Sequence, residues 1–225
     1  MELKILFEDN HIIVVEKPVN IPSQGDKTGD EDMLTIIKNY LIEKYKKPGD
    51  AYLGLVHRLD RPTGGVMVFA KTSKAASRLS EQVREKMFEK EYLCIVDGKM
   101  EKDTGTFEDY LLKNEKNNLS KVVDSKNKNA KFAKLDYEVI KYNEETNLSA
   151  VKVKLYTGRH HQIRVQFAQR NHSLYGDQKY GSRGRGKQLC LWAYKLSFLH
   201  PISKERMEFE DYPKPNGSWI ILDEN

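Results

Sequence analysis

Strand-like segments outnumber helical ones along this 225-residue chain, and they do not alternate regularly with helices. Short apolar or alternating runs at residues 3–7, 11–17, 66–70 and 90–97 are typical of strands, and similar runs recur at 135–139, 151–155 and 189–198. A regular strand–helix–strand alternation, which would indicate a parallel sheet, is missing from the pattern. The sequence therefore predicts an α+β fold with a mixed or largely antiparallel sheet flanked by helices.

Three segments have helical spacing. Residues 33–47 carry apolar side chains on one face, and Ser73 is the expected N-cap of a second helix that runs to about Phe88 with Met87 facing inward. A third helical pattern starts at His160 and continues to about residue 170. Asp97-Gly98 is a hairpin signal after the strand at 90–97.

Composition narrows the class of protein. Hydrophobic residues make up 39% of the chain and charged residues 32%, which suits a packed core with a solvated surface. No apolar run is long enough to cross a bilayer, and no secretory signal follows the charged start at Glu2 and Lys4. Two cysteines are too few for a disulfide framework or a cysteine-based zinc site. We expect a soluble, cytoplasmic protein that does not bind a membrane.

Positive charge is concentrated in two segments. Residues 156–188 contain seven basic residues and one acid, a local charge of +6, whereas the whole chain carries +5. An arginine-rich segment with a single acid indicates a polyanionic partner, because phosphate contacts dominate nucleic-acid affinity. Residues 111–141 hold eight lysines and four acids. For 113–128 within that segment, a solvated loop and a polyanion contact both remain open.

The segment His57-Arg58-Leu59-Asp60 precedes the turn residues Pro62 to Gly65. A carboxylate on an exposed loop between apolar strands is well placed for catalysis. Taken alone, an aspartate at such a position is more often a turn former or a helix cap. Both readings therefore stay open on this segment by itself.

The segment Thr157-Gly158-Arg159-His160-His161-Gln162-Ile163-Arg164 fits either a basic surface helix or an anion-binding helix start. Adjacent helical residues point in different directions, so we do not expect His160 and His161 to hold a metal together. Tyr92 lies among strand residues, where core packing is the ordinary role.

Taken together and in this order, the motifs resemble the RluA-type pseudouridine synthases. The resemblance runs from about Leu6 to Pro201 and is carried by Leu6-Phe7-Glu8-Asp9, Val14-Val15-Glu16-Lys17-Pro18, His57-Arg58-Leu59-Asp60, Thr63-Gly64-Gly65, Lys90-Glu91-Tyr92, Gly158 to Val165, Gly176-Asp177, Tyr180-Gly181 and His200-Pro201. It implies one pseudouridine synthase catalytic domain over 1–225, with two lobes around a central RNA-binding cleft as an option. It also implies that the small N-terminal RNA-binding module of many relatives is absent. The chain departs from the family pattern at His160 and Gln166, which leaves RNA contacts in doubt.

The resemblance implies an isomerase that converts specific uridines of rRNA or tRNA to pseudouridine as a monomer, without cofactor or metal. Asp60 would be the nucleophile, Arg164 would pair with it, and Tyr92 would stack on the target base and assist proton removal at carbon 5. Arg58 would fill the gap left by the flipped base. The other RNA-binding residues would be His57, Arg159, His160, Arg183, Arg185 and Lys187.

Two other classes of protein share parts of this pattern. A non-catalytic RNA-binding or ribosome-assembly protein would keep the fold but lose the catalytic residues, whereas this chain has Asp60, Tyr92 and Arg164. A nucleosidase or glycosidase would use Asp60 with a second acidic residue, for which no matching motif appears. Three routes for Asp60 remain open: attack on the sugar, attack on the uracil ring, and deprotonation of the sugar to a glycal.

Overall fold

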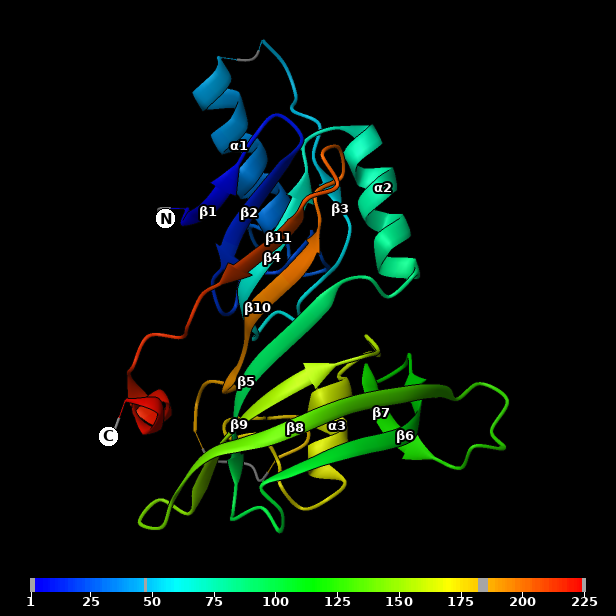
Figure 1. The fold of residues 1–225 in the computed structure, drawn as a ribbon, viewed down its shortest axis with the longest axis vertical. Coiled ribbons are helices and arrows are strands. Elements are labelled where there is room, and N and C mark those ends of the chain that lie inside the picture. The colour runs from blue at the N-terminus through cyan, green and yellow to red at the C-terminus, as the bar shows by residue number, and fades with distance from the viewer. Residues whose placement is uncertain (1–2, 47, 182–185, 224–225) are drawn as a thin grey trace. The chain divides into compact units, whose positions relative to one another are not determined.

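The computed structural model describes residues 3–46, 48–181 and 186–223. The chain forms two compact units, the first comprising residues 1–89 and 193–212 and the second residues 90–192 and 213–225 (Figure 1). Strands predominate in both units, in agreement with the α+β prediction. Among the described residues, no helix is long and apolar enough to cross a membrane.

The first unit is built on a sheet with the order β1-β2-β4-β10, to which β3 and β11 are added at β4 and β10. The pairs β1–β2, β2–β4, β3–β4 and β10–β11 are antiparallel. Two helices, α1 and α2, accompany this sheet (Figure 1). The bounds are β1 Ile5–Glu8, β2 Ile12–Lys17, α1 Met33–Tyr45, β3 Gly54–Leu55, β4 Gly64–Ala70, α2 Ser73–Arg84, β10 Leu191–Leu199 and β11 Arg206–Glu210.

The core of the first unit lies on the central strands. Every residue of β4 is buried, as are Ile12 to Val15 of β2. Alternate residues of a strand point to opposite faces. Ile12 and Val14 accordingly pack with Leu79 of α2, while the residues between them lie on the other face. The apolar runs at 11–17 and 66–70 are confirmed as strands.

The ends of the two helices differ from the sequence prediction. The Asp32 carboxylate caps α1 by accepting hydrogen bonds from two backbone amides, and α1 ends at Tyr45 instead of residue 47. Thr72, not Ser73, is the N-cap of α2. The predicted end of α2 near Phe88 is wrong, because Lys86 adopts the left-handed conformation (φ 59°) just after the helix. That turn leaves Met87 40% exposed and directs Phe88 into the core.

The second unit is an antiparallel sheet with the order β5-β9-β8-β6-β7 and a short helix, α3, packed against β6 and β7 (Figure 1). The predicted alternation in β8 is confirmed, since Ala133, Leu135 and Tyr137 are buried. A 3₁₀ helix, η1, lies near the C-terminal end. The bounds are β5 Glu89–Asp97, β6 Thr104–Asn114, β7 Leu119–Val123, β8 Lys131–Asn143, β9 Leu148–Leu155, α3 Gln162–Ala168 and η1 Gly217–Leu222.

One local prediction for the second unit is wrong, and one of the two readings left open for residues 113–128 holds only in part. Asp97-Gly98 does turn the chain, but β5 pairs with β9 and not with the strand that follows, so no β5–β6 hairpin forms. The solvated-loop reading of 113–128 also fails in part. Residues 119–123 form β7, which pairs with β6 as a hairpin, because β6 supplies backbone partners that the lysine-rich sequence does not reveal.

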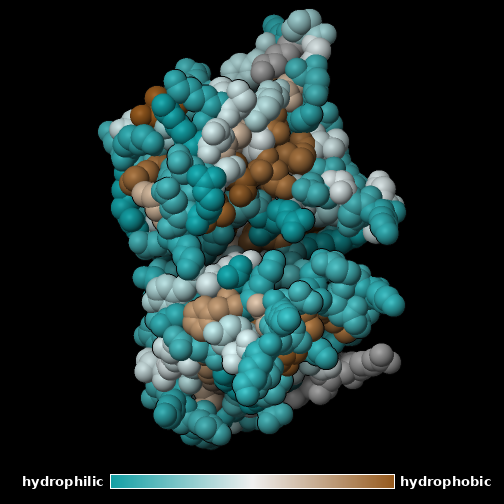
Figure 2. All heavy atoms as spheres, turned by 90° about the vertical axis from the view of Figure 1, so that its right-hand side faces the viewer, coloured by the Kyte–Doolittle hydropathy of each residue, from teal (hydrophilic) through white to brown (hydrophobic). Residues whose placement is uncertain are grey.

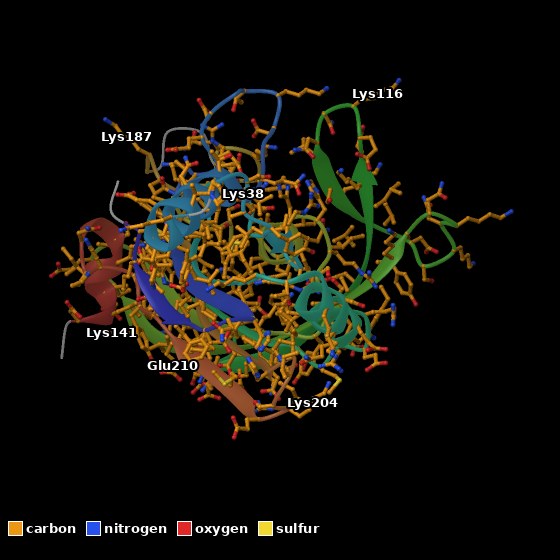
Figure 3. The ribbon with its side chains drawn as sticks, turned by 90° about the horizontal axis from the view of Figure 1, so that it is seen from above. Lys38, Lys116, Lys141, Lys187, Lys204 and Glu210 are labelled. Atoms are coloured by element: carbon orange, nitrogen blue, oxygen red, sulfur yellow. The ribbon has the colours of Figure 1, made fainter. Side chains whose placement is uncertain are left out.

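The protein surface is largely polar. On the face shown in Figure 2, hydrophilic residues predominate and apolar residues form smaller areas between them. This distribution fits a charged fraction of 32%. Several lysines and a glutamate extend outward from the ribbon, as the labelled side chains of Figure 3 show.

Candidate active site

Asp60 lies in a turn that leads into β4. The Thr63 amide donates to the Asp60 carbonyl at 2.9 Å and closes this turn. The preceding residue is held by Ser23, whose hydroxyl donates to the Leu59 carbonyl at 2.8 Å and accepts from the Leu59 amide at 3.2 Å. The Asp60 side chain is half-buried, whereas Leu59 is buried. The turn therefore presents a partly accessible carboxylate on a fixed backbone.

Lys17, at the end of β2, ties that strand to the Asp60 turn. Its ammonium group donates to three backbone carbonyls, those of Pro18 (2.9 Å), Arg61 (3.1 Å) and Thr63 (2.7 Å), and the residue is fully buried. Burial lowers the pKa of Lys17 to about 7, partly opposed by the negative charge of Asp60. Sequence reasoning quoted Lys17 only as part of a motif and missed this contact. A lysine that ends an apolar strand just before a proline was the available signal.

The close packing of β4 also depends on Gly65, which has φ 121°. A Cβ atom at this position would lie 2.2 Å from the Ala193 carbonyl oxygen of β10. Both the conformation and the space therefore require glycine here, and the Thr63-Gly64-Gly65 motif has a steric cause.

Arg58 and His57 precede Asp60 and differ in their surroundings. Arg58 is exposed, as an RNA-contacting residue must be. His57 is buried, its Nε2 atom accepts a hydrogen bond from the Val68 amide at 3.1 Å, and its ring meets Phe88 edge-on. This environment gives His57 packing contacts, and its predicted contact with RNA stays a prediction.

Arg164 lies in α3 of the second unit and forms a buried, two-pronged ion pair with Asp177. Its Nε and Nη2 atoms donate to the two Asp177 carboxylate oxygens at 2.8 and 2.7 Å. The side chains are only 5% and 0% exposed. Asp177 Oδ1 also accepts from the amides of Lys179 (2.9 Å) and Tyr180 (3.2 Å). The Arg164 guanidinium lies over the Tyr180 ring, 5.2 Å from its centroid. Asp177 and Tyr180 thus hold the guanidinium, a role that sequence reasoning did not assign to them.

His160 and His161 do not diverge as predicted. Their rings lie against each other, with centroids 3.7 Å apart and planes tilted by 30°, because both precede α3 and His161 adopts the left-handed conformation (φ 54°). His161 Nδ1 lies 2.7 Å from the Tyr180 hydroxyl, which accepts from the Ser120 amide, also at 2.7 Å. Burial and the charge of Arg164 lower the pKa of His161 to about 2. His161 is therefore neutral near pH 7, and its Nδ1 atom can accept a hydrogen bond from the Tyr180 hydroxyl.

The remaining predicted residues are distributed as follows. Tyr92 is 8% exposed in β5, where it pairs with Val153 of β9. The Arg159 Nε atom donates to the Phe132 carbonyl at 2.8 Å. Lys187 is exposed (Figure 3), and Arg183 and Arg185 lie outside the described residues. Asp60 belongs to the first unit and Tyr92 and Arg164 to the second, so their predicted meeting stays a prediction.

No metal-ligand cluster stands out in the part of the chain that the structure describes. Groups of three or more histidine, cysteine, aspartate or glutamate side chains close enough to hold an ion are not found there. Both cysteines are buried and free, and burial raises the pKa of Cys190 to about 12.

Comparison with known proteins gives this arrangement a family. A model described as "RNA pseudouridylate synthase" matches residues 11–169. An uncharacterized RNA pseudouridine synthase of Aquifex aeolicus is 35% identical, with 92% of this chain and 68% of that protein covered. The ribosomal large subunit pseudouridine synthase D of Neisseria meningitidis is 33% identical, with 99% of this chain and 61% of that protein covered.

Solved structures agree on the fold. Human RNA pseudouridylate synthase domain containing 4 matches with a TM-score of 0.79 at 20% identity, over 96% of this chain and 90% of that one. This chain spans about two thirds of the length of the relatives from Aquifex and Neisseria. The predicted resemblance is confirmed: with a family model covering most of its length, the chain belongs to the RNA pseudouridylate synthases, a family of isomerases.

Proposed function

We propose that the chain isomerises specific uridines of ribosomal or transfer RNA to pseudouridine, with Asp60 as the nucleophile. The observation that carries the proposal is the Asp60 turn itself. Its carboxylate is partly accessible, while Lys17 and Ser23 hold the backbone on either side. Rigid support behind a reactive group reduces the cost of orienting it for reaction.

The reaction rearranges one nucleotide. The target uridine leaves the base stack, at a cost of a few kcal/mol, and the bond between N1 and the sugar carbon C1′ breaks. The uracil turns, a bond forms between C5 and C1′, the proton at C5 is lost and N1 gains a proton. Atoms and electrons balance within the nucleotide and water, so no oxidant or group donor enters.

Each predicted site residue has a step in this sequence. The Asp60 carboxylate would stabilise or trap the sugar or the ring when the N1 bond breaks. Tyr92 would stack on the uracil and its hydroxyl would assist removal of the C5 proton. Arg164 would pair with Asp60 while its other nitrogens keep Asp177, since a guanidinium has five N–H donors. The three routes for Asp60 predict the same overall product.

Ribosomal RNA has the stronger support as the substrate. The relative from Neisseria is named as a large-subunit ribosomal synthase, and so is the synthase C of Haemophilus influenzae, which is 31% identical. Transfer RNA remains the alternative. Arg58, Arg159, His160 and Lys187 are the described residues that we propose as RNA contacts, and Arg183 and Arg185 complete the set.

Carbodiimide mapping of pseudouridine in total RNA tests the proposal. RNA from a deletion strain should lack at least one modification, which the wild-type gene restores and the Asp60→Asn variant does not. Asp50→Asn is the matched control, since Asp50 is an exposed carboxylate of the same unit that pairs with Lys38. Unchanged profiles in every stable RNA would contradict the proposal. Release of free uracil by the purified protein would favour a glycosidase instead.

A further inference from the structure

A hollow of about 490 Å³ opens on the second unit, and neither Arg164 nor Asp177 lines it. Its walls come from the β6–β7 hairpin, the residues just before and at the start of β8, and the turn at 158–160. Ligand pockets in proteins typically range from about 300 to 1,000 Å³. A single phosphate ion would leave most of this hollow empty, whereas one nucleotide is of suitable size.

Cationic side chains dominate the walls. Lys113, Lys131 and Arg159 line the hollow together with a single acid, Glu115, so its local charge is +2. Glu115 accepts a hydrogen bond from Lys113 at 2.6 Å, and Lys131 and Arg159 add the remaining positive charge. Lys131 pairs in register with Leu111, and Lys113 is two residues further along β6, so all three lie on one face of the sheet. Leu111 packs under Val165 of α3. The two lysines therefore lie on the same sheet face as α3.

Polar groups complete the lining. Ser120 and the Asn129 amide can donate and accept hydrogen bonds, and His160 contributes its ring. Gly158 adds backbone without a side chain, and a Cβ atom there would meet nothing within 4 Å. Such donors and acceptors suit a base edge or a ribose hydroxyl, while the cations suit a phosphate. The lining thus combines the two features that recognise an unpaired nucleotide.

The hollow is also connected to Arg164 through direct contacts. Ser120 Oγ lies 2.9 Å from His160 Nδ1, and the tilted His160 ring contacts the His161 ring. His161 in turn contacts the Tyr180 hydroxyl, and the Tyr180 ring lies under the Arg164 guanidinium. An occupant of the hollow would therefore be linked to the proposed catalytic Arg164 through Ser120, His160, His161 and Tyr180.

We propose that this hollow binds an unpaired nucleotide, with its phosphate, of the same RNA strand that carries the target uridine. The inference rests on the proposed function for the identity of the polymer, because the family acts on RNA. It adds Lys113, Lys131 and Asn129 to the RNA contacts, none of which the basic segment 156–188 contains. The phosphate pairs with the two lysines and Arg159, and the base or ribose meets Ser120, Asn129 and His160.

The first test measures the salt dependence of RNA binding. The probe is a fluorescein-labelled oligouridylate of about twenty nucleotides, followed by anisotropy between about 50 and 200 mM KCl. Lys113→Gln combined with Lys131→Gln should flatten the slope of log affinity against log salt by about 1.4, since each lost contact to single strands removes about 0.7. If the lines for the wild-type protein and the double variant meet at 1 M salt, the double variant should bind RNA about 25-fold more weakly than the wild type at 0.1 M, which is one decade lower.

The control removes the same charge elsewhere. Lys204 and Lys214 are exposed lysines outside the hollow, so Lys204→Gln combined with Lys214→Gln has the same net charge as the test variant. The control should keep the wild-type slope. Equal slopes in the test variant and wild type would overturn the proposal, and so would an equal loss in both double variants.

The second test uses the unmodified protein. Brief acetylation followed by mass spectrometry should show Lys113 and Lys131 protected by the oligouridylate, while Lys204 and Lys214 react as before. Polyglutamate of matched charge should not give this protection. Equal protection by polyglutamate would mean an unspecific anion surface or an acidic protein partner, and it would contradict a nucleotide site.

Failure of the proposed function would look different. If the wild-type protein forms pseudouridine but the hollow variant has unchanged RNA binding and unchanged KM, only the hollow proposal fails. If the wild-type protein forms no pseudouridine while its hollow lysines are protected by RNA and not by polyglutamate, the hollow stands and the catalytic proposal fails.

Discussion

Replacing Asp177 by asparagine tests how Arg164 is held. The change keeps the size of the side chain and removes its charge, which leaves the Arg164 guanidinium buried beside a neutral amide. One of the two hydrogen bonds from Arg164, at 2.7 and 2.8 Å, would face an amide NH₂ group instead of an oxygen. The hydrogen bond from the Tyr180 amide to residue 177 can remain, because the side-chain carbonyl oxygen of asparagine still accepts it.

The expected cost follows from burial. Both partners are at most 5% exposed. Removing one partner of a buried ion pair costs about 3–5 kcal/mol, because the remaining charge lacks both water and a counter-ion. With a urea dependence of about 2–3 kcal/mol per molar, the unfolding midpoint should fall by about 1–2.5 M. Urea titrations followed by far-UV circular dichroism at pH 7 measure this shift.

Asp109→Asn is the matched control in the same unit. Asp109 pairs with Arg170, and these side chains are 11% and 32% exposed. Water can therefore solvate the arginine that remains, and the expected cost is about 1 kcal/mol or less. An Asp177→Asn cost below about 1 kcal/mol, or one equal to that of Asp109→Asn, would refute the reasoning that burial makes the Arg164 pair indispensable.

Four further outcomes are expected. Asp60→Asn should lower the rate of pseudouridine formation by at least about ten thousand-fold while RNA binding is retained. Tyr92→Phe should still detach and rejoin the base, and mass spectrometry of the RNA should show that the rejoined, still protonated adduct accumulates. Normal product formation by Tyr92→Phe would contradict the role of its hydroxyl in proton transfer. Burial lowers the pKa of Lys17 to about 7 in the folded protein, against 10.5 when unfolded, so the unfolded chain binds more protons between these two pH values. The free energy of unfolding should therefore rise with pH across this window by up to about 5 kcal/mol relative to Lys17→Met. Parallel pH profiles of urea stability for the two proteins would contradict this prediction. Gly65→Ala should cost about 3 kcal/mol or more through strain and overlap with β10, whereas Gly158→Ala, which meets nothing within 4 Å, should change the unfolding midpoint little.

The sequence was most informative where local patterns decide the structure. Continuous apolar runs and two-residue alternation identified strands such as β4 and β8, because burial on one or both faces has a direct signature in the chain. Ends of elements were less predictable. The α2 helix ends before its apolar pattern does, because Lys86 turns the chain and tertiary packing takes Phe88 into the core.

The contacts that support the site were outside the reach of local patterns. Lys17 meets Thr63 across 46 positions of sequence, and Arg164 meets Asp177 across 13. The motifs that contain these residues were recognised, but only the folded backbone shows which side chain holds which. The β7 strand was hidden for a similar reason, since its pairing with β6 is decided by the partner strand and not by its own lysine-rich composition.

The anchor at Lys17 has a consequence for sequence variation around the nucleophile. Its ammonium group donates hydrogen bonds to the backbone carbonyls of Pro18, Arg61 and Thr63, and these bonds involve no side chain of the loop. Substitutions at position 61 keep these carbonyls, although they remove the Arg61 side-chain contacts with Asn20, Thr28 and Asp30. An insertion or deletion between 60 and 63 would displace the carbonyls and release the anchor. Libraries intended to retarget such an enzyme should accordingly vary side chains in this loop and conserve its length.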